Sequence, residues 1–195
     1  ALQQQVIHSE ELSTDSYDVY YINYVVDKSG SRFYGVLTVP KGEESEKYPA
    51  VVIYPGAGVR GYGSPDARLS KERIITLQLG VHGIPINQPA EIYSSLAKGA
   101  LNGYQYFNLQ SAEQYYFNRI IKGSLRALDY LQTVAQFDGE NIIASGSSQG
   151  GALSLIVTSL DKRIKGTALY CPAMCQTNGS LFNTAEGWPK PMKYA

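Results

Sequence analysis

One short segment of the sequence has residue types and a spacing that could support nucleophilic catalysis. Gly146, Ser148 and Gly150 form a G-x-S-x-G pattern, with an apolar run at 141–145 directly before it and an apolar, amphipathic run at 149–160 directly after it. In such a strand–turn–helix context, a serine hydroxyl is lifted above the end of a sheet, where it can attack an acyl carbon.

The glycines of this pattern have a steric reason. The residues two before and two after a serine at such a bend face each other closely, so a side chain at either position would clash. We therefore predict Ser148 as a catalytic nucleophile, and Ser147 is out of register for the bend. The alternative is a glycine-rich turn in which Ser148 only caps the following helix.

Two backbone N–H groups are candidates for stabilising the negative charge that develops on an attacked carbonyl oxygen. Gln149 lies at a predicted helix N-terminus, where aligned peptide dipoles favour negative charge. A second donor is expected from the loop that follows an earlier strand. Here that loop is Pro55-Gly56-Ala57-Gly58, from which we select Ala57, with Gly58 as the runner-up. The alternative is that this loop is an ordinary tight turn.

Apolar segments predict the elements that must hold these groups. Residues 17–26 and 32–39 are expected to pair as strands across a turn at 27–30. Further strands are predicted over 49–54, 73–82, 141–145 and 164–170, and helices over 65–72 (with Ser64 as cap and Pro65 at the first position), 91–98, 112–136 and 149–160. The helix at 112–136 has a stripe of Phe117, Ile120, Ser124, Leu128, Leu131 and Ala135. From residue 49 onward strands and helices alternate, which predicts an α/β fold: a mostly parallel central sheet with helices on both faces.

The 195 residues are expected to form one domain. Residues 1–16 are interpreted as an N-terminal extension. Residues 83–110 contain Gly, Pro, Asn and Gln throughout and predict a long excursion on the active-site side, because long loops in compact domains are usually functional. No stretch is long and apolar enough to span a bilayer.

The two histidines, His8 and His82, both precede Ser148, although this class of site places its acid and histidine after the serine. The 49–54 strand is expected to lie between the strand before His82 and the strand before Ser148. Two strand spacings are roughly 10 Å, beyond the ~3 Å reach of a general base. His82 is therefore expected to line a pocket with Gly56 and Gly58, and His8 to be exposed.

Asp161 and Glu186 come after Ser148, but neither follows a recognisable further strand. The simplest interpretation is that this chain lacks a C-terminal part with the acid, the histidine and the last strands of the sheet. A sheet that ended after 164–170 would have an open edge and uncovered apolar surface. We therefore expect an incomplete domain with little or no activity by itself.

The segment GSSQGGALS, followed by LDKRIKG and CPAMC, resembles acetyl xylan esterases and cephalosporin C deacetylases. The segment YYFNRIIKGSLRALDYL and the PGAGV loop share this likeness, which runs from about residue 32 to Pro189. The resemblance implies an α/β-hydrolase fold, removal of acetyl groups from sugars or similar alcohols, and a Ser–His–Asp triad without a metal or other cofactor. It places Ser148 as nucleophile and Gln149 as first oxyanion donor. The family often has His-Gly-Tyr where this chain has Pro55-Gly56-Ala57.

The leading hypothesis is a serine esterase that removes acetyl or similar short acyl groups from carbohydrate or related esters. One alternative is a non-catalytic α/β-hydrolase-like binding protein that lacks a complete triad. Another is a serine peptidase of the prolyl-oligopeptidase type, which also uses Gly-x-Ser-x-Gly-Gly. The residue after the serine is Gln149, and no propeller domain is evident, so the peptidase ranks lower.

Composition narrows the class of partner. Lys plus Arg and Asp plus Glu each number 17, so the zero net charge gives no reason to expect nucleic acid or an anionic membrane surface. The expected partner is a small-molecule or carbohydrate ester, with a homo-oligomer left open. The many tyrosines and few lysines favour an exported protein. Cys171 and Cys175 match no metal or redox motif and are expected to be free, partly buried thiols.

Overall fold

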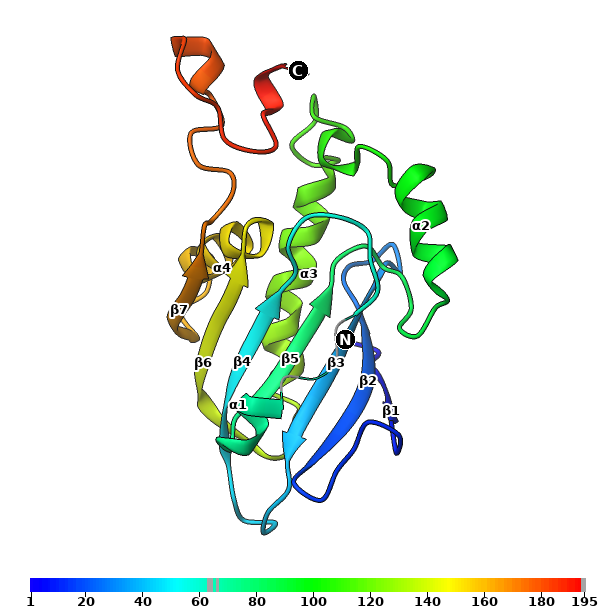
Figure 1. Ribbon diagram of the computed structural model, residues 1–195. Coiled ribbons are helices and arrows are strands. Elements are labelled where there is room, and N and C mark those ends of the chain that lie inside the picture. The colour runs from blue at the N-terminus through cyan, green and yellow to red at the C-terminus, as the bar shows by residue number, and fades with distance from the viewer. Residues whose placement is uncertain (63–64, 66, 194–195) are drawn as a thin grey trace.

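The computed structural model describes residues 1–62, 65 and 67–193. Among these residues seven strands form one sheet in the order β1-β2-β3-β5-β4-β6-β7 (Figure 1). The strands are β1 (Gln5–His8), β2 (Tyr17–Val25), β3 (Arg32–Pro40), β4 (Tyr48–Tyr54), β5 (Ile75–Gly80), β6 (Phe137–Ser147) and β7 (Ile164–Tyr170). The helices are α1 (Ala67–Lys71), α2 (Ala90–Lys98), α3 (Tyr116–Leu131) and α4 (Gln149–Leu160), with short 3-10 turns η1 (Tyr104–Tyr106), η2 (Gly179–Phe182) and η3 (Pro191–Lys193).

The sheet has an antiparallel half and a parallel half. Strands β1, β2, β3 and β5 pair antiparallel in that order, and β5, β4, β6 and β7 pair parallel. The β2–β3 hairpin turns at Asp27, whose carbonyl accepts the N–H of Gly30 at 3.2 Å. The parallel pairing puts the carboxyl ends of β4, β5 and β6 at one edge of the sheet, where the candidate site residues follow (Figure 1).

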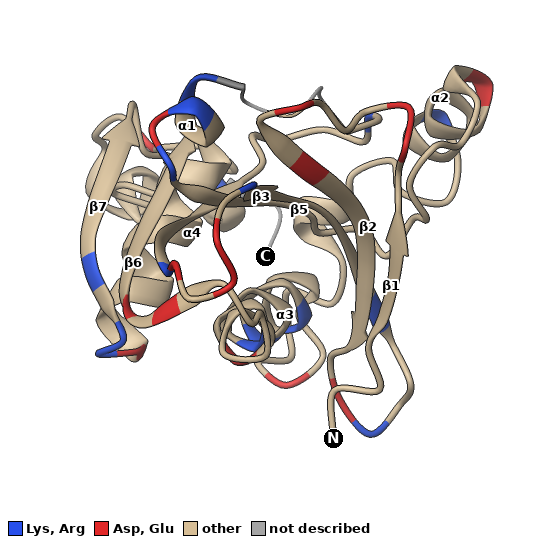
Figure 2. Cartoon of the chain, turned by 90° about the horizontal axis from the view of Figure 1, so that it is seen from below, with Lys and Arg blue, Asp and Glu red and all other residues tan. Residues whose placement is uncertain are grey.

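Helices cover both faces of the sheet, as the alternation of elements predicts. The chain passes from β4 to β5 in one direction along the sheet and from β5 to β6 in the other. Right-handed crossovers therefore place α1 and α3 on opposite faces, as Figure 2 shows. Helix α4 packs beside α3 and against β6, β7 and β4, and α1 contacts β3 and β5.

Helix α3 buries the predicted stripe but is shorter than the predicted 112–136. Phe117, Ile120, Ser124, Leu128 and Leu131 are buried, whereas Ala135 is exposed. The helix ends at Leu131 because turns compete with it: the hydroxyl of Thr133 donates to the carbonyl of Tyr130 at 2.7 Å. Before the helix, the N–H of Gln114 donates to the hydroxyl of Ser111, which forms another turn. Local side-chain bonds of this kind override apolar periodicity.

Other predicted boundaries are also wrong. Strand β5 is shorter than the predicted 73–82, and β6 is longer than 141–145. Strand β6 includes Gly139, whose φ is +84°, and the register between β6 and β4 shifts in this part of the strand. The N-terminal extension contains strand β1, which pairs with β2; all four of its residues are exposed, so they show no alternation. Helix α1 begins at Ala67, and the proposed cap Ser64 lies outside the described residues.

No helix in the described part of the chain is both long and apolar enough to cross a membrane. Acidic and basic residues are interspersed over the elements and loops (Figure 2). The fold itself is held by a core in which β2, β3, β4 and β5 pack against α3.

Gly123 lies where α3 meets β3, and a Cβ there would be 2.3 Å from the ring of Phe33, which is fully buried. We expect Gly123→Ala to lower the free energy of unfolding by about 1–3 kcal/mol, although Ala is the better helix former, because a packed core leaves the ring no room to move. Urea unfolding measures this. Lys122→Ala, exposed on the same helix, is the control, and equal stability of the two variants would contradict the contact.

Candidate active site

Ser148 lies at a sharp bend between β6 and α4. Its φ of +54° and ψ of −119° are rare for a residue with a side chain, and such backbone strain costs about 1–3 kcal/mol. Three backbone hydrogen bonds hold the bend. The N–H of Ser148 donates to the carbonyl of Tyr170 at 3.0 Å, and its own carbonyl accepts the N–H groups of Ala152 at 3.1 Å and Ala173 at 2.9 Å. The side chain of Ser148 is exposed, so its hydroxyl is accessible.

The two glycines of the pattern allow the backbone segments around the bend to touch. A Cβ on Gly146 would lie 2.4 Å from the carbonyl carbon of Gly150. A Cβ on Gly150 would lie 2.1 Å from the carbonyl oxygen of Tyr54, at the end of β4. Both distances are far inside van der Waals contact with rigid backbone, so only glycine fits. The bend is thus packed directly against the neighbouring strand.

Gln149 is the first residue of α4, so its N–H has no partner within the helix and lies at the positive end of the helix dipole. Its side chain is fully buried. The hydroxyl of Tyr104 donates to Gln149 Oε1 at 2.6 Å, and Gln149 Nε2 donates to the carbonyl of Pro55 at 3.5 Å. Because a carbonyl only accepts, the second contact assigns the orientation of the amide.

The loop after β4 comes close to the bend. A Cβ on Gly56 would lie 3.7 Å from the carbonyl oxygen of Ser147. The N–H of Gly58 donates to Tyr104 Oη at 3.2 Å, which leaves it occupied. Within the described residues, no hydrogen bond uses the N–H of Ala57, while its carbonyl accepts from Arg60. Of the two loop donors considered from the sequence, Ala57 is therefore the one whose N–H is available.

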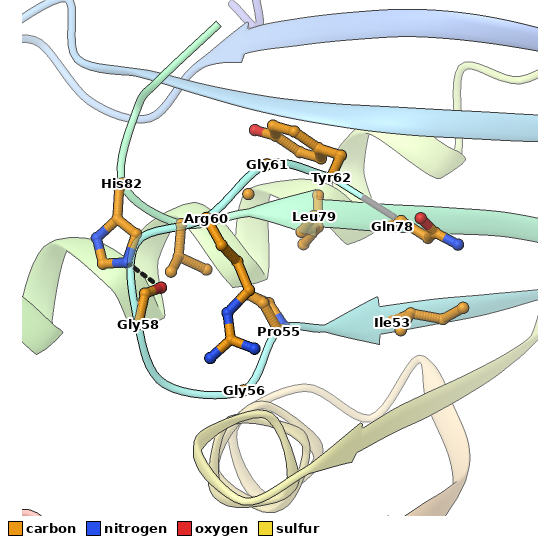
Figure 3. Close-up of a pocket in the computed structure, with 12 residues that line it drawn as sticks. Ile53, Pro55, Gly56, Gly58, Arg60, Gly61, Tyr62, Gln78, Leu79 and His82 are labelled. Atoms are coloured by element: carbon orange, nitrogen blue, oxygen red, sulfur yellow. Dashed lines mark hydrogen bonds between the residues drawn. The ribbon is translucent and has the colours of Figure 1, made fainter. Parts of the chain in front are cut away.

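His82 follows β5 and is bound through both ring nitrogens. Its Nε2 lies 3.2 Å from the carbonyl of Gly58 (Figure 3) and its Nδ1 lies 3.0 Å from Tyr116 Oη. Since the carbonyl can only accept, Nε2 carries the proton and Nδ1 accepts from the tyrosine hydroxyl. Burial lowers the pKa of His82 to about 4, with a further lowering by Arg119, against the opposing effect of the Gly58 hydrogen bond. Strand β4 lies between β5 and β6, so His82 is separated from Ser148 as expected.

A cavity of about 330 Å³ lies at the carboxyl ends of β4 and β5 (Figure 3). Its lining includes the three residues that the sequence suggested for a pocket, Gly56, Gly58 and His82, and also the cation Arg60. Ser148 is not among the residues that line it. Gly56 faces both the cavity and the carbonyl of Ser147, and so connects the cavity to the bend.

Two other titratable candidates, Asp161 and His8, lie away from Ser148. Asp161 follows the last residue of α4 and accepts from Arg163, so the 12-residue helix, roughly 18 Å at 1.5 Å per residue, separates it from Ser148. His8 lies on β1, five strands from β6 in the sheet order, and binds Asp18 at 3.1 Å. Glu186 accepts the N–H of Met192 at 3.0 Å through Oε1. Among the described residues, no group of three or more His, Cys, Asp or Glu could hold a metal ion.

The segment after β7 packs back onto the start of α3 and onto the excursion, which sequence periodicity did not predict. Trp188 meets Phe117 edge to face, with ring centroids 6.2 Å apart, and the hydroxyl of Tyr106 donates to the carbonyl of Pro189 at 2.7 Å. Cys171 and Cys175, in the same segment, are free thiols. They were predicted to be partly buried, which is wrong. Both are exposed because the segment packs through its aromatic and backbone groups instead.

The sequence did not predict the roles of Tyr104 and Tyr116. Tyr104 is buried, and its hydroxyl binds the loop after β4 directly, at the N–H of Gly58. Tyr116 is half-buried, and its hydroxyl binds His82, which in turn binds the carbonyl of Gly58. The only signal was the high tyrosine content together with the position of Tyr104 in the 83–110 excursion. Neither feature indicates a hydrogen-bond partner.

A mixed sheet whose parallel half carries the site, helices on both faces, and the strained serine between β6 and α4 define the α/β-hydrolase fold, as predicted. The family model for acetyl xylan esterases matches residues 2–181. The chain therefore belongs to the acetyl xylan esterase family, and the resemblance seen in the sequence is confirmed.

Known relatives agree with this assignment. Acetyl esterase Axe7A of Xylanibacter ruminicola is 34% identical over 184 residues, which cover 92% of this chain and 41% of the relative. The structure of an acetyl xylan esterase from Paenibacillus sp. R4 has a TM-score of 0.81 at 25% identity, over 99% of this chain and 61% of that one. Acetyl xylan esterase 1 from Thermoanaerobacterium sp., at 18% identity and a TM-score of 0.75, shares the fold over 94% of this chain and 56% of its own. The chain thus spans less than two thirds of each.

The environment of His82 predicts a loss of stability in acid. Its pKa is about 4 in the folded protein against 6.5 ordinarily, so its contribution is complete above pH 6.5 and is lost as the pH falls from 6.5 through 4. We expect the free energy of unfolding to decrease by up to about 1.4 kcal/mol per pH unit in this range. His82→Gln cannot titrate and should show a shallower slope in urea unfolding. If the free energy of unfolding changed with pH equally in the variant and the wild type, the lowered pKa of His82 would be contradicted.

Proposed function

We propose that the full gene product containing this chain is a serine esterase that removes acetyl or similar short acyl groups from carbohydrate esters. The observation that carries the proposal is the strained, exposed Ser148 at the N-terminus of α4. Membership in the acetyl xylan esterase family supports the reaction class. The names of the relatives, an acetyl esterase and two acetyl xylan esterases, support the acyl group and the carbohydrate substrate.

In the proposed reaction, Ser148 Oγ loses its proton to a general base and attacks the carbonyl carbon of the ester. The resulting oxyanion accepts hydrogen bonds from the N–H groups of Gln149 and Ala57, which are positioned before the charge develops. The tetrahedral intermediate collapses, the C–O bond to the alcohol breaks, and the alcohol leaves with a proton. Water then attacks the acyl-serine by the same path and releases the carboxylic acid.

The general base is proposed to be a histidine outside residues 1–195, oriented by an acid that is also outside them. Within the described residues, both ring nitrogens of His82 are engaged, by Gly58 and by Tyr116. His8 lies at the far edge of the sheet. The cavity beside Gly56 is proposed to accept part of the ester, because it is the concave surface that connects to the bend.

Labelling of the full gene product with a fluorophosphonate probe tests the proposal. We expect one adduct, on Ser148, and Ser148→Ala should lose the adduct and lower kcat for an acetylated sugar by at least about 10³-fold. Ser147→Ala is the matched control, because Ser147 is the adjacent exposed serine and should keep both. A folded wild-type protein that forms no adduct at Ser148 would instead support the non-catalytic alternative.

A further inference from the structure

The phenol of Tyr104 bridges the two backbone segments that carry the proposed oxyanion donors. Tyr104 begins η1, within the 83–110 excursion, and is 4% exposed. Its hydroxyl oxygen accepts the N–H of Gly58 at 3.2 Å, and the same hydroxyl donates to Gln149 Oε1 at 2.6 Å. Burial raises the pKa of Tyr104, so the hydroxyl keeps the proton that it donates.

The two contacts have a defined direction. The amide of Gln149 uses Oε1 to accept from Tyr104 and Nε2 to donate to the carbonyl of Pro55. The loop after β4 is thus held at Pro55 by its carbonyl and at Gly58 by its N–H. The carbonyl of Gly58 is held in addition by His82. Each group donates or accepts as its chemistry requires.

Ala57 lies between these two anchors. The other proposed donor is the N–H of Gln149. The side chain of Gln149 binds Pro55 directly and is linked to Gly58 through the hydroxyl of Tyr104. One hydrogen-bond network therefore links the loop that carries Ala57 to the residue that carries the other proposed donor. Among the described residues, the side chain of Gln149 has hydrogen bonds to the Tyr104 hydroxyl and the Pro55 carbonyl and to no other group.

We propose that Tyr104 is a positioning residue that fixes the separation of the Ala57 and Gln149 N–H groups around the oxyanion. This inference rests on the proposed esterase function. Stabilisation of a tetrahedral oxyanion depends on donors that are already placed where charge develops, and a displacement of about 1 Å can lower a rate strongly. The ester carbonyl of the bound substrate carries less charge, so the network should affect kcat far more than KM.

Tyr104→Phe tests the inference in the full gene product. The ring of Tyr104 packs edge to face against His82, with centroids 4.6 Å apart, so phenylalanine should keep this packing and remove only the hydroxyl. The matched control is Tyr24→Phe. Tyr24 is fully buried and donates to the carbonyl of Gly123 at 2.9 Å, in the core between β2 and α3.

We expect Tyr104→Phe to lower kcat by about tenfold or more, with KM changed less than about twofold, while Tyr24→Phe keeps the wild-type kcat. Both variants should lose some thermal stability, because each removes one buried hydroxyl. Wild-type kcat in Tyr104→Phe, or a loss that is expressed only in KM, would overturn the positioning role. A wild-type protein without esterase activity would overturn the proposed function as well, so the two failures are distinguishable.

Gln149→Met provides a second, independent measurement. It removes the side-chain amide but keeps the backbone N–H and a similar volume. If Tyr104 acts through Gln149, adding Tyr104→Phe to Gln149→Met should lower kcat much less than it does in the wild-type protein. Full additivity of the two substitutions in kcat would show that Tyr104 does not act through this network.

Discussion

The strained backbone of Ser148 is the constraint on which the rest of the site depends. A positive φ at a residue with a side chain persists only where its surroundings enforce it, and here the carbonyl of Tyr170 and the N–H of Ala173 do so from the end of β7 and the segment after it. Gly150 places the start of α4 against the end of β4. Three parallel strands and one helix therefore converge on a single residue. The antiparallel half of the sheet and α3 provide the core behind this arrangement.

The fold was predictable where the signal is local. Strands β2, β3, β4 and β7 correspond closely to apolar runs between turn residues, and α4 begins directly after the serine of the G-x-S-x-G pattern. The errors occur where another interaction decides. Strand β1 exists because β2 offers a pairing edge, and β6 extends through Gly139 because β4 pairs with it on both sides of the irregularity. Neither cause lies within the segment concerned.

The site divides in the same way. The bend at Ser148 and the loop at Pro55-Gly56-Ala57-Gly58 are marked by glycines, whose steric reason can be stated without a structure. The pairing of Tyr104 with Gln149 joins residues 45 apart in the chain and follows no periodicity. Equally, nothing in the local sequence indicates whether Gly58 or Ala57 offers its N–H to the oxyanion. The two differ because the hydroxyl of Tyr104 occupies the N–H of Gly58. Long-range polar partners are the part of an active site that sequence patterns do not contain.

The contact between Trp188 and Phe117 has a practical consequence. Trp188 is the only tryptophan among these 195 residues, and it lies half-buried where the segment after β7 rests on the start of α3. Its indole emission therefore reports on release of this segment rather than on melting of the sheet. In this chain, intrinsic fluorescence and far-ultraviolet dichroism observe two different parts of the molecule, and a difference between their transitions would reveal that the segment detaches before the domain unfolds.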